Sequence, residues 1–139
     1  MTAGTDIARL ADRFRRALDD EDYDVVKSML TSNCHYHARN GILVGREAIV
    51  ASYRDQSKVA RRLFDAVEYA SVVTKTDDQT AVIMFSDRLL SQGKEHVYRC
   101  HQMVHFGPGG LIDTIKHQEL PDQREQLLRF CNALGICLT

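Results

Sequence analysis

The sequence has no excess of charge of either sign. Its 18 Lys and Arg residues are balanced by 19 Asp and Glu residues, which gives a formal net charge of −1. A protein that holds a phosphate backbone needs concentrated positive charge, so this balance argues against a nucleic-acid partner. The 27% of charged and 44% of hydrophobic residues are ordinary for a globular protein and exclude disordered, collagen-like and coiled-coil chains.

Long apolar runs are also absent. No stretch approaches the roughly 18 residues of a membrane span, and the first residues lead into charged positions without the apolar core of a signal peptide. We therefore expect no membrane association and a cytoplasmic location. The 139 residues show no linker or repeat, so we expect a single domain over residues 1–139.

Motifs for several kinds of chemistry are missing. The four cysteines, Cys34, Cys100, Cys131 and Cys137, form no CxxC pair, so neither a zinc ribbon nor a thioredoxin-like motif is indicated. The sequence contains no GxSxG, Walker A or GxGxxG motif, which leaves those nucleophile and nucleotide-binding classes unsupported. We expect no bound cofactor.

The N-terminal part of the sequence has the periodicity of helices. Apolar side chains from Ile7 to Leu18 recur every three or four residues, which predicts an amphipathic helix. The acidic run from Asp19 to Asp22 is interpreted as a solvated turn that caps the next helix. The full set of predicted helices covers residues 6–18, 23–30, 45–56 and 121–134. A short hairpin, 34–38 and 42–44, turns at Asn40-Gly41.

From residue 66 onward the period changes to that of β-strands. Three turn signals divide this part into four long strands over residues 66–76, 79–91, 94–106 and 111–120. Short turns between long strands predict an antiparallel meander, and strands of this length must twist and curl. We predict an α+β fold in which a strongly curved antiparallel sheet, a cone-shaped half-barrel, wraps around the N-terminal helices and is followed by a C-terminal helix. A cavity is expected between the sheet and the helices.

Three segments make this order of elements resemble the nuclear transport factor 2-like superfamily. Residues 14–22 are similar to the end of that family's first helix, and residues 110–115 to its last hairpin. Gly45 to Tyr53, Gly-Arg-Glu-Ala-Ile-Val-Ala-Ser-Tyr, is similar to its third helix. The resemblance implies the cone-shaped fold and the branch of SnoaL-like polyketide cyclases and ketosteroid isomerases. It leaves the function open, because this fold hosts isomerases, cyclases, dehydratases and non-catalytic binders.

The residues that a ketosteroid isomerase needs are replaced in this sequence. Aligned on the same motif, the base position falls on Ala38, the tyrosine donor on Phe14 and the acidic donor on Gln102, so steroid isomerisation is not expected. The SnoaL-like branch places an acidic base late on the final strand, where this sequence has His117. The resemblance therefore implies a proton-transfer role for His117.

Strand alternation predicts which side chains face the cavity. The inward polar groups include His117, Asp87 and Gln102, which are the candidate catalytic residues. His117 is the candidate acid–base group, because imidazole exchanges a proton near neutral pH. Asp87 or Glu119 would orient its ring, and Gln102 would donate its amide to a substrate carbonyl. The predicted substrate-binding residues are Phe14, Tyr36, Tyr53, Phe85, Tyr98, Cys100 and Glu119. Their aromatic share indicates a small hydrophobic or aromatic ligand.

The opposite face of the predicted sheet carries apolar residues. Met84, Val97 and Met103 project to this outer side, and an apolar outer face favours a partner. We therefore predict a homodimer through the outer sheet face.

Two pairs of histidines fall on the same side, where no further ligand converges on them, so no metal site is expected. These histidines are His35, His37, His101 and His105.

Three functions remain open at this point. The first is a small-molecule enzyme, an isomerase, cyclase or dehydratase that acts on a cyclic or polyketide-like substrate by acid–base chemistry. Cys100 beside His117 adds a thiol nucleophile as an enzymatic option. The second is a non-catalytic ligand-binding module, whose pocket holds no competent acid or base. The inward polar groups could instead only satisfy one another or cap helices, with no ligand bound. The third is an assembly protein similar to the small subunit of a ring-hydroxylating dioxygenase, which has this fold.

Overall fold

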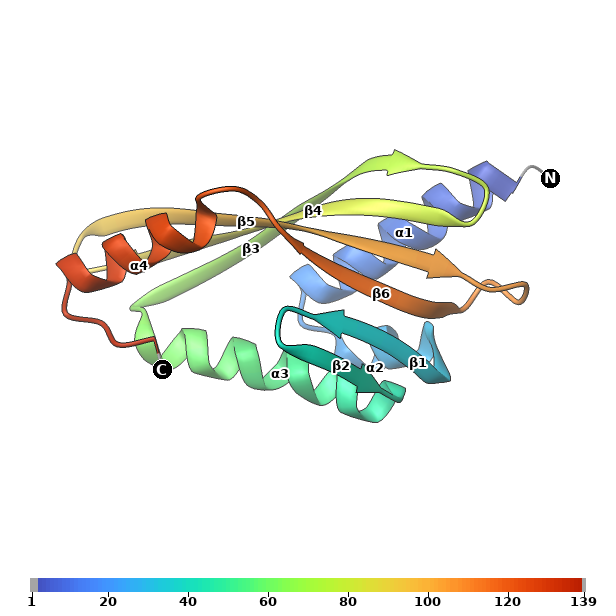
Figure 1. The fold of residues 1–139 in the computed structure, drawn as a ribbon, viewed down its shortest axis with the longest axis horizontal. Helices are drawn as coiled ribbons and strands as arrows, with labels where there is room; N and C mark the ends of the chain where they lie inside the picture. Colours follow the sequence, from blue (N-terminus) through green and yellow to red (C-terminus); the bar gives the residue numbers. More distant parts are fainter. Residues whose placement is uncertain (1–2, 139) are drawn as a thin grey trace.

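The computed structural model describes residues 3–138, which form four helices and six strands. Figure 1 shows their arrangement. In chain order the elements are α1 (Ala3–Asp19), α2 (Tyr23–Ser28), β1 (Leu30–Ala38), β2 (Gly41–Val44), α3 (Arg46–Leu63), β3 (Ala66–Thr76), β4 (Thr80–Ser91), β5 (Lys94–Phe106), β6 (Ile112–Glu119) and α4 (Gln123–Ala133). No helix among these elements is long and apolar enough to cross a membrane.

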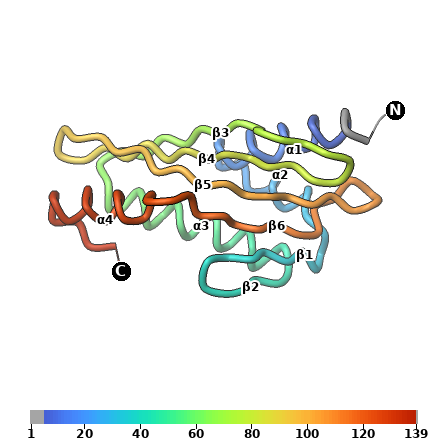
Figure 2. The backbone as a smooth tube through the Cα atoms, turned by 45° about the horizontal axis from the view of Figure 1, so that its top comes forward, coloured from blue at the N-terminus to red at the C-terminus, as the bar shows by residue number. Residues whose placement is uncertain are grey.

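The six strands form one curved, open sheet in the order β2-β1-β6-β5-β4-β3, with α1, α2 and α3 beneath one face (Figure 2). This confirms the predicted α+β fold with its curved sheet, N-terminal helices and C-terminal helix. Four of the strand pairings are antiparallel, as predicted, whereas β1 and β6 run parallel. A parallel pair requires a long crossover connection, and here α3 and the β3–β5 meander lie between the two strands.

Helix α3 is longer than its sequence pattern indicates. The predicted helix ends at about Gln56, whereas α3 continues to Leu63. Its last turns are held by contacts with distant segments: the Arg61 guanidinium lies 5.5 Å from the centre of the Tyr69 ring and forms an ion pair with Glu21. These contacts extend the helix through a segment whose own sequence is polar and basic.

Strand β1 begins before the predicted strand start at residue 34. Leu30 pairs with Ile112 of β6, and the Ile112 N–H donates a hydrogen bond of 2.8 Å to the Met29 carbonyl. The same extension ends α2 at Ser28. Because the partner strand is distant in the sequence, no local pattern marks this strand start.

The apolar core has two parts. The larger cluster packs α1, α2 and α3 against the inner face of the sheet and includes Phe14, Ile49 and Ile83. The smaller cluster includes Phe64 and Cys131 and joins the end of α3 to α4, which packs against β5 at the end of the sheet far from the N-terminus (Figure 1). The candidate site is lined by residues from the edges of both clusters.

Candidate active site

A cavity of about 240 Å³ lies between the inner face of the sheet and helices α1, α2 and α3. All five tyrosines of the sequence line it. They come from three strands and two helices on different sides of the cavity, so aromatic surface surrounds the space on most sides. These tyrosines are Tyr23, Tyr36, Tyr53, Tyr69 and Tyr98.

Most of the predicted site residues line this cavity. They are Tyr36, Tyr53, Phe85, Asp87, Tyr98, Cys100, Gln102 and His117. Two predicted residues do not. Phe14 is completely buried in the larger core cluster, where it packs against other apolar side chains. Glu119 lies two residues beyond His117 at the exposed end of β6, with its carboxylate 3.4 Å from the Arg39 Nε.

A hydrogen-bonded network fixes the side chain of Gln102, which is 5% exposed. The Tyr53 hydroxyl donates to Gln102 Oε1 at 2.7 Å, and Gln102 Nε2 donates to the Tyr36 hydroxyl oxygen at 3.1 Å. The two tyrosine rings meet edge to face at 5.7 Å. The Tyr36 O–H has no acceptor among the described residues, so its proton is available to a ligand in the cavity. Burial raises the pKa of both tyrosines, which keeps them protonated as donors.

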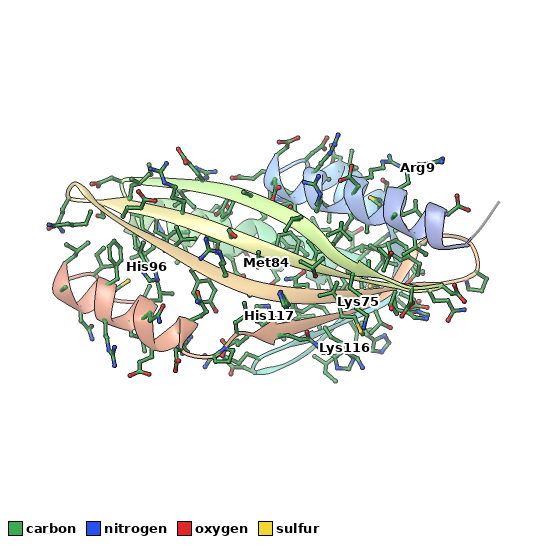
Figure 3. All side chains as sticks on the ribbon, turned by 90° about the horizontal axis from the view of Figure 1, so that it is seen from above. Arg9, Lys75, Met84, His96, Lys116 and His117 are labelled. Carbon is green, nitrogen blue, oxygen red and sulfur yellow. The ribbon has the colours of Figure 1, made fainter. Side chains whose placement is uncertain are left out.

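His117 lies on β6 (Figure 3). It pairs with Gln102 of the neighbouring strand β5. Its Nδ1 atom is buried and has no hydrogen-bond partner within the described part of the chain. Burial lowers the pKa of the imidazole, and this effect outweighs the opposing influence of Glu119. The ring is therefore neutral at pH 7, which is the state in which imidazole accepts a proton.

Asp87 lies at a different position along the strands from Gln102 and His117. It pairs with Tyr98 of β5, four residues along that strand from Gln102, so roughly 13 Å of strand separates the levels of Asp87 and His117. The Asp87 carboxylate accepts no hydrogen bond from any described residue. Burial, and then the negative charge of Asp19, raise the pKa of Asp87 to about 6. Asp87 therefore does not orient the His117 ring, and it forms a second titrating group in the same cavity.

Asp19 lines the cavity, although the sequence pattern groups it with Asp22 in a solvated acidic turn. Asp22 does cap α2, accepting a bond of 3.4 Å from the Val25 N–H. The Asp19 Oδ2 atom instead accepts a bond of 2.7 Å from the Ser71 hydroxyl of β3. Its other oxygen is buried without a partner among the described residues, and burial raises the pKa of this carboxyl as well. Asp19 is the last residue of α1 and lies about 100° from the apolar stripe that ends at Leu18, so no pattern in the sequence marks it as a cavity residue.

Most of the chain matches a known protein family. Residues 1–110 match the family model described as the SnoaL-like domain. The chain belongs to the SnoaL-like domain family. This confirms the resemblance to the nuclear transport factor 2-like superfamily that the segment from Gly45 to Tyr53 indicates. A comparison with curated protein sequences finds no significant match.

Solved structures share this SnoaL-like fold at low sequence identity. A putative polyketide cyclase from Xanthomonas campestris pv. campestris is 14% identical, with a TM-score of 0.65, over 84% of this chain and 91% of that one. An LEH-like epoxide hydrolase from M. tuberculosis is 19% identical, with a TM-score of 0.66, over 95% and 96%. A protein from a soil-derived mobile gene cassette is 15% identical, with a TM-score of 0.68, over 84% and 91%. Identities this low establish the shared fold alone.

Cys100 of the SnoaL-like domain is not directly opposite His117 in the strand register. It faces Phe85 on one neighbouring strand and Glu119 on the other, whereas His117 faces Gln102. Burial raises the pKa of the Cys100 thiol to about 12, with Asp87 and Glu119 contributing in the same direction. A thiol in this environment stays protonated at neutral pH.

Within the described residues, no group of three or more His, Cys, Asp or Glu side chains is arranged to hold a metal ion.

Proposed function

We propose that this SnoaL-like protein is a cofactor-independent small-molecule enzyme that works by acid–base chemistry. The reaction class is an isomerisation, cyclisation or dehydration of a cyclic or polyketide-like substrate. The observation that carries the proposal is the presence of two titrating groups without hydrogen-bond partners among the described residues, His117 and Asp87, in one aromatic cavity. The fold shared with a putative polyketide cyclase and an epoxide hydrolase supports a small-molecule reaction.

In this proposal His117 removes a proton from the substrate. Its neutral imidazole accepts the proton, and the negative charge that develops on a nearby substrate oxygen is stabilised by the Tyr36 O–H and by the second N–H of the Gln102 amide. Tyr53 acts through Gln102 by holding the amide in this orientation. Asp87, whose pKa of about 6 lies close to neutral pH, exchanges a proton at a different substrate atom.

Binding of the substrate is assigned to the aromatic walls. Tyr36, Tyr53, Phe85 and Tyr98 offer flat apolar surface on several sides of the cavity, which suits a flat, mainly uncharged ring system. Cys100 contributes a small protonated thiol to the same wall. Phe14 and Glu119, which do not line the cavity, have no place in this assignment.

We further propose that the protein acts as a homodimer in the cytoplasm. Met84 projects from β4 to the outer side of the sheet, the side seen in Figure 3, and Val72 beside it is 47% exposed. An apolar face on the outer side of a sheet favours association with a second copy.

The cytoplasmic location is supported by the cysteines. Three of them are buried free thiols, as expected in a reducing compartment: Cys34, Cys100 and Cys131.

The test is proton exchange measured on a defined probe. 1-Tetralone in D₂O loses its α-proton when a base in the cavity acts on it, and NMR follows the exchange. Replacing His117 with asparagine keeps the shape and one donor but removes proton transfer, so we expect the catalysed rate to fall by about 10²–10⁴ with folding intact. His101→Asn is the matched control, because His101 faces outward from β5, and it should keep the wild-type rate.

The pH dependence has a defined direction. The pKa of His117 is lowered below 6.5, so His117 is in its basic form above pH 6.5, and the exchange rate should fall as the pH drops below that value through its pKa. If 1-tetralone and related bicyclic ketones bind in the cavity but exchange no faster than in buffer, the protein is a ligand-binding module and the catalytic proposal is wrong.

A further inference from the structure

A second compartment adjoins the candidate active site. It has a volume of about 390 Å³ and lies between the C-terminal half of α3 and helix α4. Four residues line both compartments, so the two spaces adjoin each other. These shared residues are Gln56, Ala60, Asp87 and Tyr98. Asp87 therefore stands at the junction where the two compartments meet.

The walls of the second compartment are apolar. Val59 and Leu63 from α3 face Leu127 from α4 and Leu138 from the segment that follows it. The two charged residues among its lining are Asp87 at the junction and the exposed Asp55, both acidic. An uncharged apolar group would bury well here, whereas an anionic group would be repelled by both carboxylates.

Helix α4 is anchored as a fixed wall. The Phe130 ring stacks on Phe64 at 6.4 Å and on His96 of β5 at 5.2 Å, and Figure 3 shows His96 beside this helix. At the start of the helix, Gln123 Oε1 accepts a hydrogen bond of 2.8 Å from the Arg99 N–H. The whole helix lies outside residues 1–110, which match the SnoaL-like domain. This wall is thus supplied by a part of the chain beyond the matched region.

We propose that the two compartments together bind one elongated, uncharged substrate. Its ring lies among the tyrosines of the first compartment, its apolar extension lies under α4 against Leu127, and a hydrogen-bond donor between the two faces Asp87. The sizes support this, because ligand sites usually measure about 300–1,000 Å³. The first compartment, at about 240 Å³, falls short of that range, whereas the first and second joined fall within it. The inference rests on the proposed function and specifies its substrate class.

A homologous series of 4-alkylphenols tests the proposal by binding alone. The phenol ring and its hydroxyl fit the first compartment, and the para chain crosses the junction and grows into the second. Measured by titration calorimetry from 4-methylphenol to 4-hexylphenol, the dissociation constant should fall by about fourfold for each added methylene. Leu127→Trp, which fills the second compartment, should remove this gain while leaving the affinity for 4-methylphenol unchanged.

Two further variants keep the result interpretable. Leu128→Trp is the matched control, because the adjacent Leu128 is 37% exposed and does not line the compartment, and it should keep the wild-type chain-length dependence. Val59→Trp fills the same space from α3, at a position that is 39% exposed and tolerates a large side chain. It gives the answer if Leu127→Trp does not fold.

A gain with chain length that persists in both Leu127→Trp and Val59→Trp would overturn the proposal, and so would the absence of any binding in the series. The proposed catalysis can fail separately. In that case His117→Asn exchanges protons as the wild type does, while the chain-length dependence and its loss in Leu127→Trp remain.

Discussion

Replacing Asp87 with asparagine should make the protein more stable at neutral pH. The Asp87 carboxyl lies in an apolar, aromatic cavity, accepts no hydrogen bond from the described residues and faces the charge of Asp19. Each of these features disfavours the ionised carboxylate in the folded state. Asparagine has nearly the same shape and carries no charge, so it removes the unfavourable ionisation and leaves the packing in place.

The magnitude follows from the pKa. Folding raises the pKa of Asp87 from 3.8 to about 6, so between these values the folded protein binds more protons than the unfolded chain. Stability is then lost as the pH rises from about 4 to 6 and stays reduced above that range. A difference of this size corresponds to about 3 kcal/mol at pH 7. Near pH 4 the folded carboxyl is protonated and the unfolded one is only partly ionised, so most of the difference between the wild type and Asp87→Asn vanishes there.

Urea unfolding of the wild type and of Asp87→Asn at several pH values between 4 and 8 measures this effect. The gain in unfolding free energy should grow with pH through this window and level off above pH 6.5. Asp78→Asn serves as the matched control, because Asp78 is exposed in the turn between β3 and β4, and it should show no comparable gain. A gain for Asp87→Asn that is the same at pH 4 and pH 7.5, or that is absent, would refute the assignment of a buried carboxylate.

Three other predictions concern different parts of the molecule. Tyr53→Phe removes the donor to the buried Gln102 Oε1 and should lower the unfolding free energy by about 1–3 kcal/mol in urea, whereas an unchanged value would contradict the network. Cys100, with its pKa raised to about 12, should react with iodoacetamide at pH 8 much more slowly in the native protein than in urea, as followed by peptide mass spectrometry; equal rates would show an accessible thiolate. Light scattering at micromolar concentration should give about twice 15.8 kDa, and Met84→Glu should shift the mass toward that of one chain; a wild-type monomer would rule out the dimer.

The fold was predictable because its elements are marked by local signals. The 3.6-residue stripe from Ile7 to Leu18 and the turns between the long strands are both patterns within a few residues of sequence. The parallel pairing of β1 with β6 has no such signal, because it depends on how the intervening helix and meander pack. The same holds for the last turns of α3, which are held by Glu21 and Tyr69 from other elements.

The face of the sheet on which the candidate site residues lie was predictable from the sequence, whereas their positions along the strands were not. Strand alternation identifies the face on which Asp87, Gln102 and His117 lie, because side chains of a strand point to opposite sides in turn. It does not give the level of each residue along the sheet, which is set by the strand register. The register separates Asp87 from His117 and brings Gln102 next to His117. Phe14 also lies on an inward stripe, but only the packing decides that it fills the core and not the cavity wall.

This separation narrows the chemistry that the proposed enzyme can perform. A separate base and acid that serve the same substrate atom must both reach it, as in a two-base racemisation, whereas proton exchange on one carbon needs only His117. Here the donors Tyr36 and Gln102 surround the His117 level, whereas Asp87 lies roughly 13 Å of strand away, at the entrance to the second compartment. A proton taken by His117 is therefore not returned to the same atom by Asp87. The arrangement favours reactions in which a proton leaves one end of an extended substrate and another is delivered several bonds away, as in a cyclisation followed by loss of water. Racemisation at a single centre is the reaction that this geometry serves least.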